Sequence, residues 1–125
     1  MEETRSDARG ERIRAAWNSH DVERVLATYA EEFRFADPET RGAIVEREGL
    51  RRYLTKLFAA VTAHTTVRAT FPLADREGVT VLWRAAVHAG AASEEVELDG
   101  VDLILFAGDR IASHEIFFDR AVFAR

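Results

Sequence analysis

The stretch Gly100-Val101-Asp102-Leu103-Ile104-Leu105-Phe106-Ala107-Gly108-Asp109-Arg110-Ile111-Ala112-Ser113-His114-Glu115-Ile116-Phe117-Phe118-Asp119 lies near the end of the chain. Its alternation of residue types predicts two strands, and Gly108-Asp109 predicts the tight turn between them. On the first strand, Asp102 is the one charged residue on an otherwise apolar face. A carboxylate on such a face is costly to bury unless it is paired, protonated or used in function. Asp102 is therefore the first candidate functional residue.

The register of this predicted hairpin decides which side chain stands beside Asp102. A two-residue turn at Gly108-Asp109 places Asp102 opposite Glu115. A three-residue turn, or a bulge, places Asp102 opposite His114 instead. We favour the second register, because His114 then shares the inward face with the apolar residues Ala112, Ile116 and Phe118.

Upstream of the hairpin, apolar residues recur at helical spacing in three segments. These helices are expected from Glu11 to about residue 18, from the N-cap Asp21 to about Glu32, and over residues 46–63, with residues 1–8 frayed. Strands are expected at 33–38, 66–73, 79–88, 94–106 and 110–119. This order predicts an α+β fold, in which three helices in the N-terminal half pack on a curved, mainly antiparallel sheet.

The composition narrows the class of protein. The chain has 125 residues, of which 47% are hydrophobic and 31% charged, as expected for one globular domain over 1–125. It has no apolar run long enough to span a membrane, and it lacks cysteine. Its first residues are charged, so we expect no signal peptide. A net charge of −5 disfavours nucleic-acid binding. We expect a cytoplasmic protein with neither a nucleic-acid nor a membrane partner.

A second carboxylate lies on an apolar strand face. Strand alternation places Phe33, Phe35 and Asp37 on the same side. If that side borders a cavity, Asp37 can act as a general base. The alternative is structural, in which Asp37 caps the following turn or pairs with Arg41.

Asp102 and His114 also have two interpretations each. Asp102 is either a neutral acid that donates a hydrogen bond to an oxyanion, or a structural carboxylate bonded to a neighbour such as His114 or Trp17. His114 is either a proton shuttle or a core histidine that partners Asp102. No pair of histidines has metal-binding spacing, and no nucleotide-binding glycine motif is present, so no metal or cofactor is expected.

Several short motifs together resemble the SnoaL-like family of the nuclear transport factor 2-like superfamily, whose relatives include ketosteroid isomerases and polyketide cyclases. The resemblance covers about residues 10 to 120 and implies a cone-shaped, cystatin-like fold around a pocket, and commonly a homodimer. It does not imply one activity. The motifs are Ala16-Trp17-Asn18-Ser19-His20-Asp21, Tyr29-Ala30-Glu31-Glu32-Phe33, Asp37-Pro38, Gly100-Val101-Asp102, Gly108-Asp109-Arg110-Ile111 and Phe117-Phe118-Asp119.

The resemblance to ketosteroid isomerases also suggests roles for individual residues. Asp37, before Pro38, matches the carboxylate that moves the proton in those enzymes, and Asp102 matches a protonated acid of their oxyanion hole. Their helix-borne tyrosine falls on Ile13, so the main oxyanion donor is missing here. Tyr53 matches a pocket-lining aromatic position and can supply a hydroxyl from another side.

We therefore predict a cofactor-free pocket protein that acts on a mainly apolar small molecule, by isomerisation, cyclisation, dehydration or hydrolysis. The alternative is a non-catalytic ligand-binding or dimerisation module, favoured if aromatic side chains fill the pocket. The apolar outer face of the last strands predicts a homodimer, unless Ala121-Val122-Phe123 covers it. The predicted catalytic residues are Asp37, Asp102 and His114, and the predicted substrate contacts are Trp17, Tyr53, Phe35, Trp83, Ile116 and Phe118, although such aromatics are commonly core residues.

Overall fold

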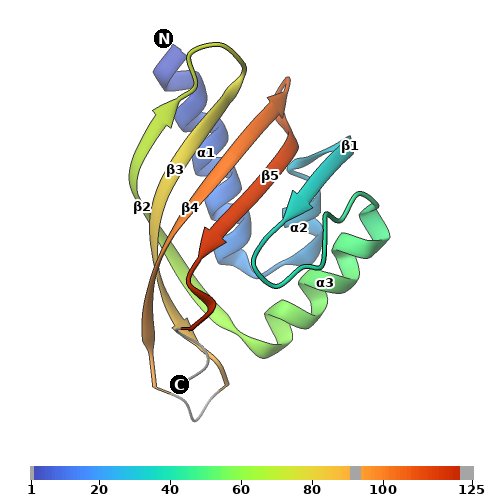
Figure 1. Cartoon of the computed structure of the whole chain (residues 1–125), viewed down its shortest axis with the longest axis vertical. Helices are drawn as coiled ribbons and strands as arrows, with labels where there is room; N and C mark the ends of the chain where they lie inside the picture. Colours follow the sequence, from blue (N-terminus) through green and yellow to red (C-terminus); the bar gives the residue numbers. More distant parts are fainter. Residues whose placement is uncertain (1, 91–93, 122–125) are drawn as a thin grey trace.

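A five-stranded sheet with all helices on one side makes up the fold, as predicted. The computed structural model describes residues 2–90 and 94–121. The strand order is β1-β5-β4-β3-β2, and only the β1–β5 pair is parallel. Figure 1 shows α1 behind the curved sheet and α3 beside its β1 edge. The elements are α1 (Glu2–Ser19), α2 (Val22–Leu26), β1 (Tyr29–Ala36), α3 (Arg47–Ala60), β2 (Thr62–Pro72), β3 (Gly78–His88), β4 (Val96–Ala107) and β5 (Arg110–Phe118).

The inner face of the sheet follows the predicted alternation most clearly in β3. Every second residue from Val79 to Val87 is buried, and its neighbours on the other face are half-buried or exposed. The inner face of β4 is also buried at Leu98, Gly100, Ile104 and Phe106, and only Asp102 interrupts it. Two adjacent strands therefore present one continuous apolar surface to the helices.

Three predicted boundaries near the N-terminus and around α3 are wrong. The first helix begins at Glu2, not Glu11, so residues 2–8 are helical and not frayed. Its early turns carry no apolar stripe, but they are rich in strong helix formers. The third helix ends at Ala60, and β2 begins at Thr62 by pairing with His88 of β3.

The second helix is much shorter than predicted. It keeps its N-cap, since the Asp21 side chain accepts hydrogen bonds from the amides of Glu23 and Arg24, but it ends at Leu26. Tyr29 then starts β1, because it pairs with Ile111 of β5. The spacing that suggested a longer helix is overridden by a strand partner that lies far away in sequence.

The β4–β5 hairpin combines features of both predicted registers. Its turn has two residues, with Ala107 opposite Arg110 and a positive φ of 63° at Gly108. One residue later a bulge shifts the pairing, so that His114 faces Ile104 and Asp102 faces Ile116. The prediction that His114 lies inward is confirmed, but the prediction that it stands directly opposite Asp102 is wrong. The two residues are diagonal neighbours, close enough for long side chains to interact.

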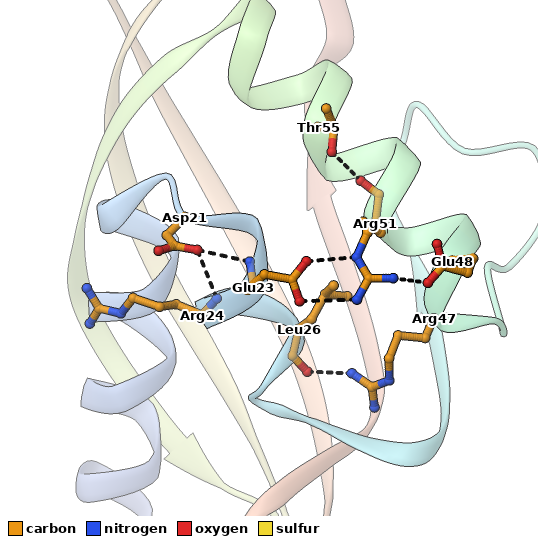
Figure 2. A network of polar contacts seen from close by, with 8 residues as sticks. All are labelled: Asp21, Glu23, Arg24, Leu26, Arg47, Glu48, Arg51 and Thr55. Atoms are coloured by element: carbon orange, nitrogen blue, oxygen red, sulfur yellow. Dashed lines mark hydrogen bonds and ion pairs between the residues drawn. The ribbon is translucent and has the colours of Figure 1, made fainter.

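Arginine side chains fix α3 against α2 (Figure 2). Arg51 makes a two-pronged pair with Glu23, at 2.7 and 3.1 Å, and also contacts Glu48. Arg47 donates to the Leu26 carbonyl at the end of α2, at 2.8 Å. These contacts hold the first two turns of α3, the helix that carries Tyr53.

The first helix is fastened to the sheet at its middle and near its C-terminal end. Arg9 is almost fully buried, lies 3.9 Å from the centre of the Phe106 ring and donates to the Gly108 carbonyl at 2.9 Å. Near the C-terminal end, the Asn18 amide makes two hydrogen bonds to the backbone of Thr65 on β2. Because β2 is a sheet edge, these bonds also satisfy backbone groups that would otherwise be unpaired there.

Candidate functional site

A cavity of about 610 Å³ lies between α1, α3 and the inner face of the sheet. This volume falls in the range of small-molecule sites. The wall is mainly apolar, with side chains from β2, β3, β4 and β5 as well as the helices. The pocket is therefore not filled by aromatic side chains, which is the arrangement that would have favoured a non-catalytic module.

Most of the predicted site residues meet at this cavity. The seven that line it are Asp37, Asp102, Trp17, Tyr53, Trp83, Ile116 and Phe118. Phe35 and His114 do not line it. Both are fully buried, and their rings pack edge to face 5.6 Å apart behind the wall. His114 thus lies one layer behind the position expected for a proton shuttle, and Phe35 one layer behind that of a substrate contact.

Asp102 is held in the wall by two side-chain donors. The Trp83 indole N–H donates to its Oδ1 at 2.8 Å, and His114 Nε2 lies 3.0 Å from its Oδ2. The predicted partner His114 is confirmed, but the second partner is Trp83 and not Trp17. The Asp102 side chain remains 17% exposed, so part of the carboxylate faces the cavity.

The protonation of His114 follows from its second neighbour, Tyr29. The Tyr29 hydroxyl lies 2.6 Å from His114 Nδ1, and both residues are fully buried. Burial, with the charges of Asp102 and Asp37, raises the pKa of Tyr29 well above its ordinary value, so the phenol keeps its proton. If that proton goes to Nδ1, the neutral imidazole carries its own proton on Nε2 and donates it to Asp102.

This arrangement leaves every proton in the chain of contacts with an acceptor. A protonated His114, or a protonated Asp102 that donates to it, would place a proton on Nδ1 and deprive the Tyr29 hydroxyl of its acceptor. We therefore assign Asp102 as an ionised carboxylate that accepts from Trp83 and His114. The predicted role of Asp102 as a neutral hydrogen-bond donor does not fit this pattern.

Asp37 combines the two interpretations left open by the sequence. Its Oδ1 accepts from the amides of Glu39 and Thr40, at 2.8 and 3.1 Å, so the carboxylate caps the turn after β1. Its Oδ2 accepts from the Tyr53 hydroxyl on α3, and both side chains line the cavity. Among the described residues, no ion pair joins Asp37 to Arg41.

Tyr53 remains protonated beside this carboxylate. Burial, the hydrogen bond to Asp37 and the negative charge of Asp37 raise the pKa of Tyr53 far above its ordinary value. The phenol is therefore a fixed donor to Asp37 or to a ligand oxygen at any physiological pH. Asp37 is correspondingly the member of the pair that can take up a proton.

The rim of the cavity carries charged residues that the sequence did not single out. Glu11 and Arg14, one turn apart on α1, form an ion pair. Glu39 lines the cavity and pairs with Arg120 at 3.0 Å. His20 also contributes, and its Nε2 accepts from the Ala63 amide at 3.1 Å.

Two hydrogen bonds of this site, Tyr29–His114 and Trp83–Asp102, were missed, although the sequence contains a signal for each. Tyr29 was assigned no role in the site, and Trp83 was predicted only as a substrate contact. A buried phenol or indole carries a polar group that needs a partner, so each such residue predicts a nearby acceptor. The two acceptors lie on β5 and β4, and only the folded topology reveals which ones they are.

The comparisons agree with this fold. The family profile of the SnoaL-like domain matches residues 11–114, and the chain therefore belongs to the SnoaL-like domain family. A search of curated protein sequences finds no match to the chain.

Many solved structures share the fold at low sequence identity. A putative isomerase from Bacillus subtilis superposes with a TM-score of 0.86 and 13% identity, covering 98% of this chain and 91% of the other. The epoxide hydrolase/cyclase-like enzyme SalBIII has a role in pyran ring formation in polyether salinomycin. It superposes with a TM-score of 0.78 and 21% identity, covering 96% of this chain and 94% of the other. A hypothetical protein with a ketosteroid isomerase-like fold from Catenulispora acidiphila, in complex with trimethylamine, superposes with a TM-score of 0.80 and 16% identity, covering 91% of this chain and 87% of the other. At sequence identities this low, the structural similarity establishes the shared fold alone.

Within 2–90 and 94–121, no group of three or more histidine, cysteine, aspartate or glutamate residues is arranged to hold a metal ion. No helix in the same ranges has the length and apolar character needed to cross a bilayer.

Proposed function

We propose that this protein is a cofactor-free acid–base enzyme for a mainly apolar small molecule, with Asp37 as the general base. The observation that carries the proposal is the Asp37–Tyr53 pair in the wall of a ligand-sized cavity. A carboxylate in such a wall is shielded from bulk water and can reach a bound substrate. Isomerisation, cyclisation, dehydration and epoxide hydrolysis are all compatible with one such base, and structural neighbours include a putative isomerase and an epoxide hydrolase/cyclase-like enzyme.

The proposed step moves one proton. Asp37 Oδ2 takes a proton from a C–H or O–H group of the substrate and returns it to another atom, or releases it to water. Tyr53 donates to the carboxylate before the step and to a substrate oxygen during it. Asp102 orients a donor group of the substrate, since both its oxygens act as acceptors.

Trp17 offers an additional contact for a substrate oxygen. Its indole N–H is buried beside the cavity, and among the described residues it has no hydrogen-bond partner. An unpaired buried donor costs about 1–3 kcal/mol. A ligand acceptor at this position would recover part of that free energy.

A generic substrate for proton abstraction tests the base directly. In 5-nitrobenzisoxazole, a base removes the ring C–H proton, the N–O bond breaks, and a coloured cyanophenolate forms. We expect saturable turnover that falls about 100-fold in Asp37→Asn, the size of a typical general-base contribution. The matched control is Asp99→Asn, an exposed carboxylate of β4 that pairs with Arg84 on the outer face.

Two results would contradict the assignment of Asp37. Folded Asp37→Asn with unchanged turnover would exclude it as the base. No saturable turnover in the wild-type protein, together with ligand-dependent thermal stabilisation, would favour a non-catalytic binding protein. That second function is supported by one specific observation, the buried Ile13 at the position of the ketosteroid isomerase tyrosine.

We further propose that the protein is a homodimer through the outer face of the sheet. The face carries a row of cross-strand neighbours, Leu82, Val101 and Phe117, with Leu103 beside it. Phe117 is 51% exposed, an unusual state for a phenylalanine on a regular strand. A second copy of the same patch is a suitable cover, since isologous interfaces pair a surface with itself. The other predicted cover for this face is the segment Ala121-Val122-Phe123, of which Val122 and Phe123 lie outside the described residues.

A further inference from the structure

The cavity contains two carboxylates, and no cationic side chain in the described part of the chain pairs with either of them. Within residues 2–90 and 94–121, the Asp37 carboxylate accepts only from the Tyr53 hydroxyl and from backbone amides. In the same ranges, Asp102 accepts only from the Trp83 indole and from His114. These donors are neutral, since His114 is held as the neutral imidazole by Tyr29. Both negative charges therefore remain uncompensated in a largely apolar wall.

The other ionisable residues of the cavity do not offset these charges. At the rim, Glu11 is paired with Arg14 and Glu39 with Arg120, so each pair contributes a net charge of about zero. His20 accepts a backbone N–H at Nε2, which places its single proton on Nδ1 and leaves the ring neutral. The interior of the cavity thus has a negative potential, which low-dielectric walls intensify.

Aromatic rings stand among the aliphatic side chains of the remaining wall. Trp17, Tyr53, Phe58 and Trp83 all line the cavity. Trp17 and Phe58 pack edge to face at 5.9 Å, so their ring planes are nearly perpendicular. Tryptophan and tyrosine rings attract an organic cation that lies over their faces, so these side chains offer contacts of that kind to a ligand in the cavity.

We propose that the ligand of this cavity is an organic cation, with an apolar body and a quaternary or protonated amine. The amine lies among the aromatic rings, within reach of the field of Asp37 and Asp102. This inference names the substrate class for the proposed function and rests on the same cavity, but it concerns ligand affinity and not the catalytic step. Repulsion from both carboxylates weakens the binding of an anionic ligand of the same size.

Three phenols of similar size and different charge test this selectivity. The probes are 4-(trimethylammonio)phenol, its neutral isostere 4-tert-butylphenol, and anionic 4-hydroxybenzenesulfonate. Isothermal titration calorimetry of the full chain measures each dissociation constant. We expect the cation to bind about tenfold more tightly than the neutral isostere, and the sulfonate to bind more weakly than both. Equal or tighter binding of the neutral isostere overturns the proposal.

Variants then show whether the two carboxylates cause the preference. The readout is the ratio of neutral to cationic dissociation constants, because partial misfolding lowers the binding of both probes alike. Asp102→Asn and Asp37→Asn should each lower this ratio about threefold or more, since each removes one of two charges. Asp99→Asn removes an exposed carboxylate from the outer face of the same strand and should leave the ratio unchanged. An unchanged ratio in both cavity variants overturns the proposal.

The two proposals can fail separately. The neutral benzisoxazole reports the base, whereas the binding ratio reports the charge preference. Loss of turnover in Asp37→Asn with no preference for the cation would retain the proposed function and reject the cationic ligand. A strong preference for the cation without any turnover would retain the ligand class and reject the base.

Discussion

At the residue scale, the two tyrosines are placed so that neither can ionise in the folded protein. Tyr29 is fully buried against His114, and Tyr53 is half-buried against Asp37. Burial is the main cause of the raised pKa of both phenols, and nearby carboxylates add to it. Since the chain contains only these two tyrosines, its phenolate absorbance reports on the site alone.

The raised pKa values predict a loss of stability in alkali. In the unfolded chain both phenols lose protons near pH 10, whereas in the folded chain they keep them. The folded state then binds more protons, so stability is unaffected below about pH 10 and decreases as pH rises beyond it. We expect phenolate absorbance to appear cooperatively, together with the loss of far-ultraviolet circular dichroism. A gradual rise near pH 10 in a fully folded protein would contradict the buried geometry, and Tyr53→Phe separates the two contributions.

Gly100 provides a second prediction at this scale. It lies opposite Trp83 on the neighbouring strand, and a Cβ added to it would overlap the indole ring. Gly100→Ala must therefore displace Trp83 and weaken its hydrogen bond to Asp102. We expect a loss of about 1–3 kcal/mol in urea unfolding and a shift in tryptophan fluorescence. Unchanged stability and emission would show that the ring is not fixed against this glycine.

At the element scale, two glycines with different backbones should respond oppositely to alanine. Gly10 is inside α1, and a Cβ there meets nothing within 4 Å. Gly10→Ala should stabilise the protein by about 0.5–1 kcal/mol through helix propensity. Gly108, in the β4–β5 turn, has a φ of 63°, so Gly108→Ala should destabilise by about 1–2 kcal/mol. Chemical unfolding measures the change in the free energy of unfolding for each variant. A change of the same sign in both variants would contradict this explanation.

The individual strands also show which structural features could be predicted from sequence patterns and which could not. The alternation in β3 and the inward position of Asp102 were predictable because every second residue of a strand shares one face. The start of β1 was not, because Val25, Leu26 and Tyr29 also fit one helical face, and only pairing with Ile111 selects the strand. Likewise, no local feature marks the bulge at Ala112, which moves His114 from a position opposite Leu103 to one opposite Ile104, diagonal to Asp102.

At the scale of the whole molecule, the site depends on segments that sequence patterns treat separately. Asp37 follows β1, Tyr53 lies on α3, and Asp102 belongs to β4. Strand parity predicted that both carboxylates face inward, and both line one cavity. The contact between Tyr29 and His114 could not be predicted in the same way, because Tyr29 reaches His114 only through the parallel pairing of β1 with β5. Long-range topology therefore decides the protonation of the site.

The outer face of the sheet gives the last prediction, which concerns assembly. If the patch around Phe117 is the dimer interface, the protein should have twice the 14.1 kDa mass of one chain in light scattering, and should dissociate on dilution. Phe117→Arg places a charge in that interface and should yield a monomer, because an unpaired buried charge is strongly unfavourable. The matched control is Val45→Arg, which changes an equally exposed apolar residue in the loop before α3. A wild-type monomer at all concentrations, or a dimer that persists in Phe117→Arg, would exclude this face as the interface.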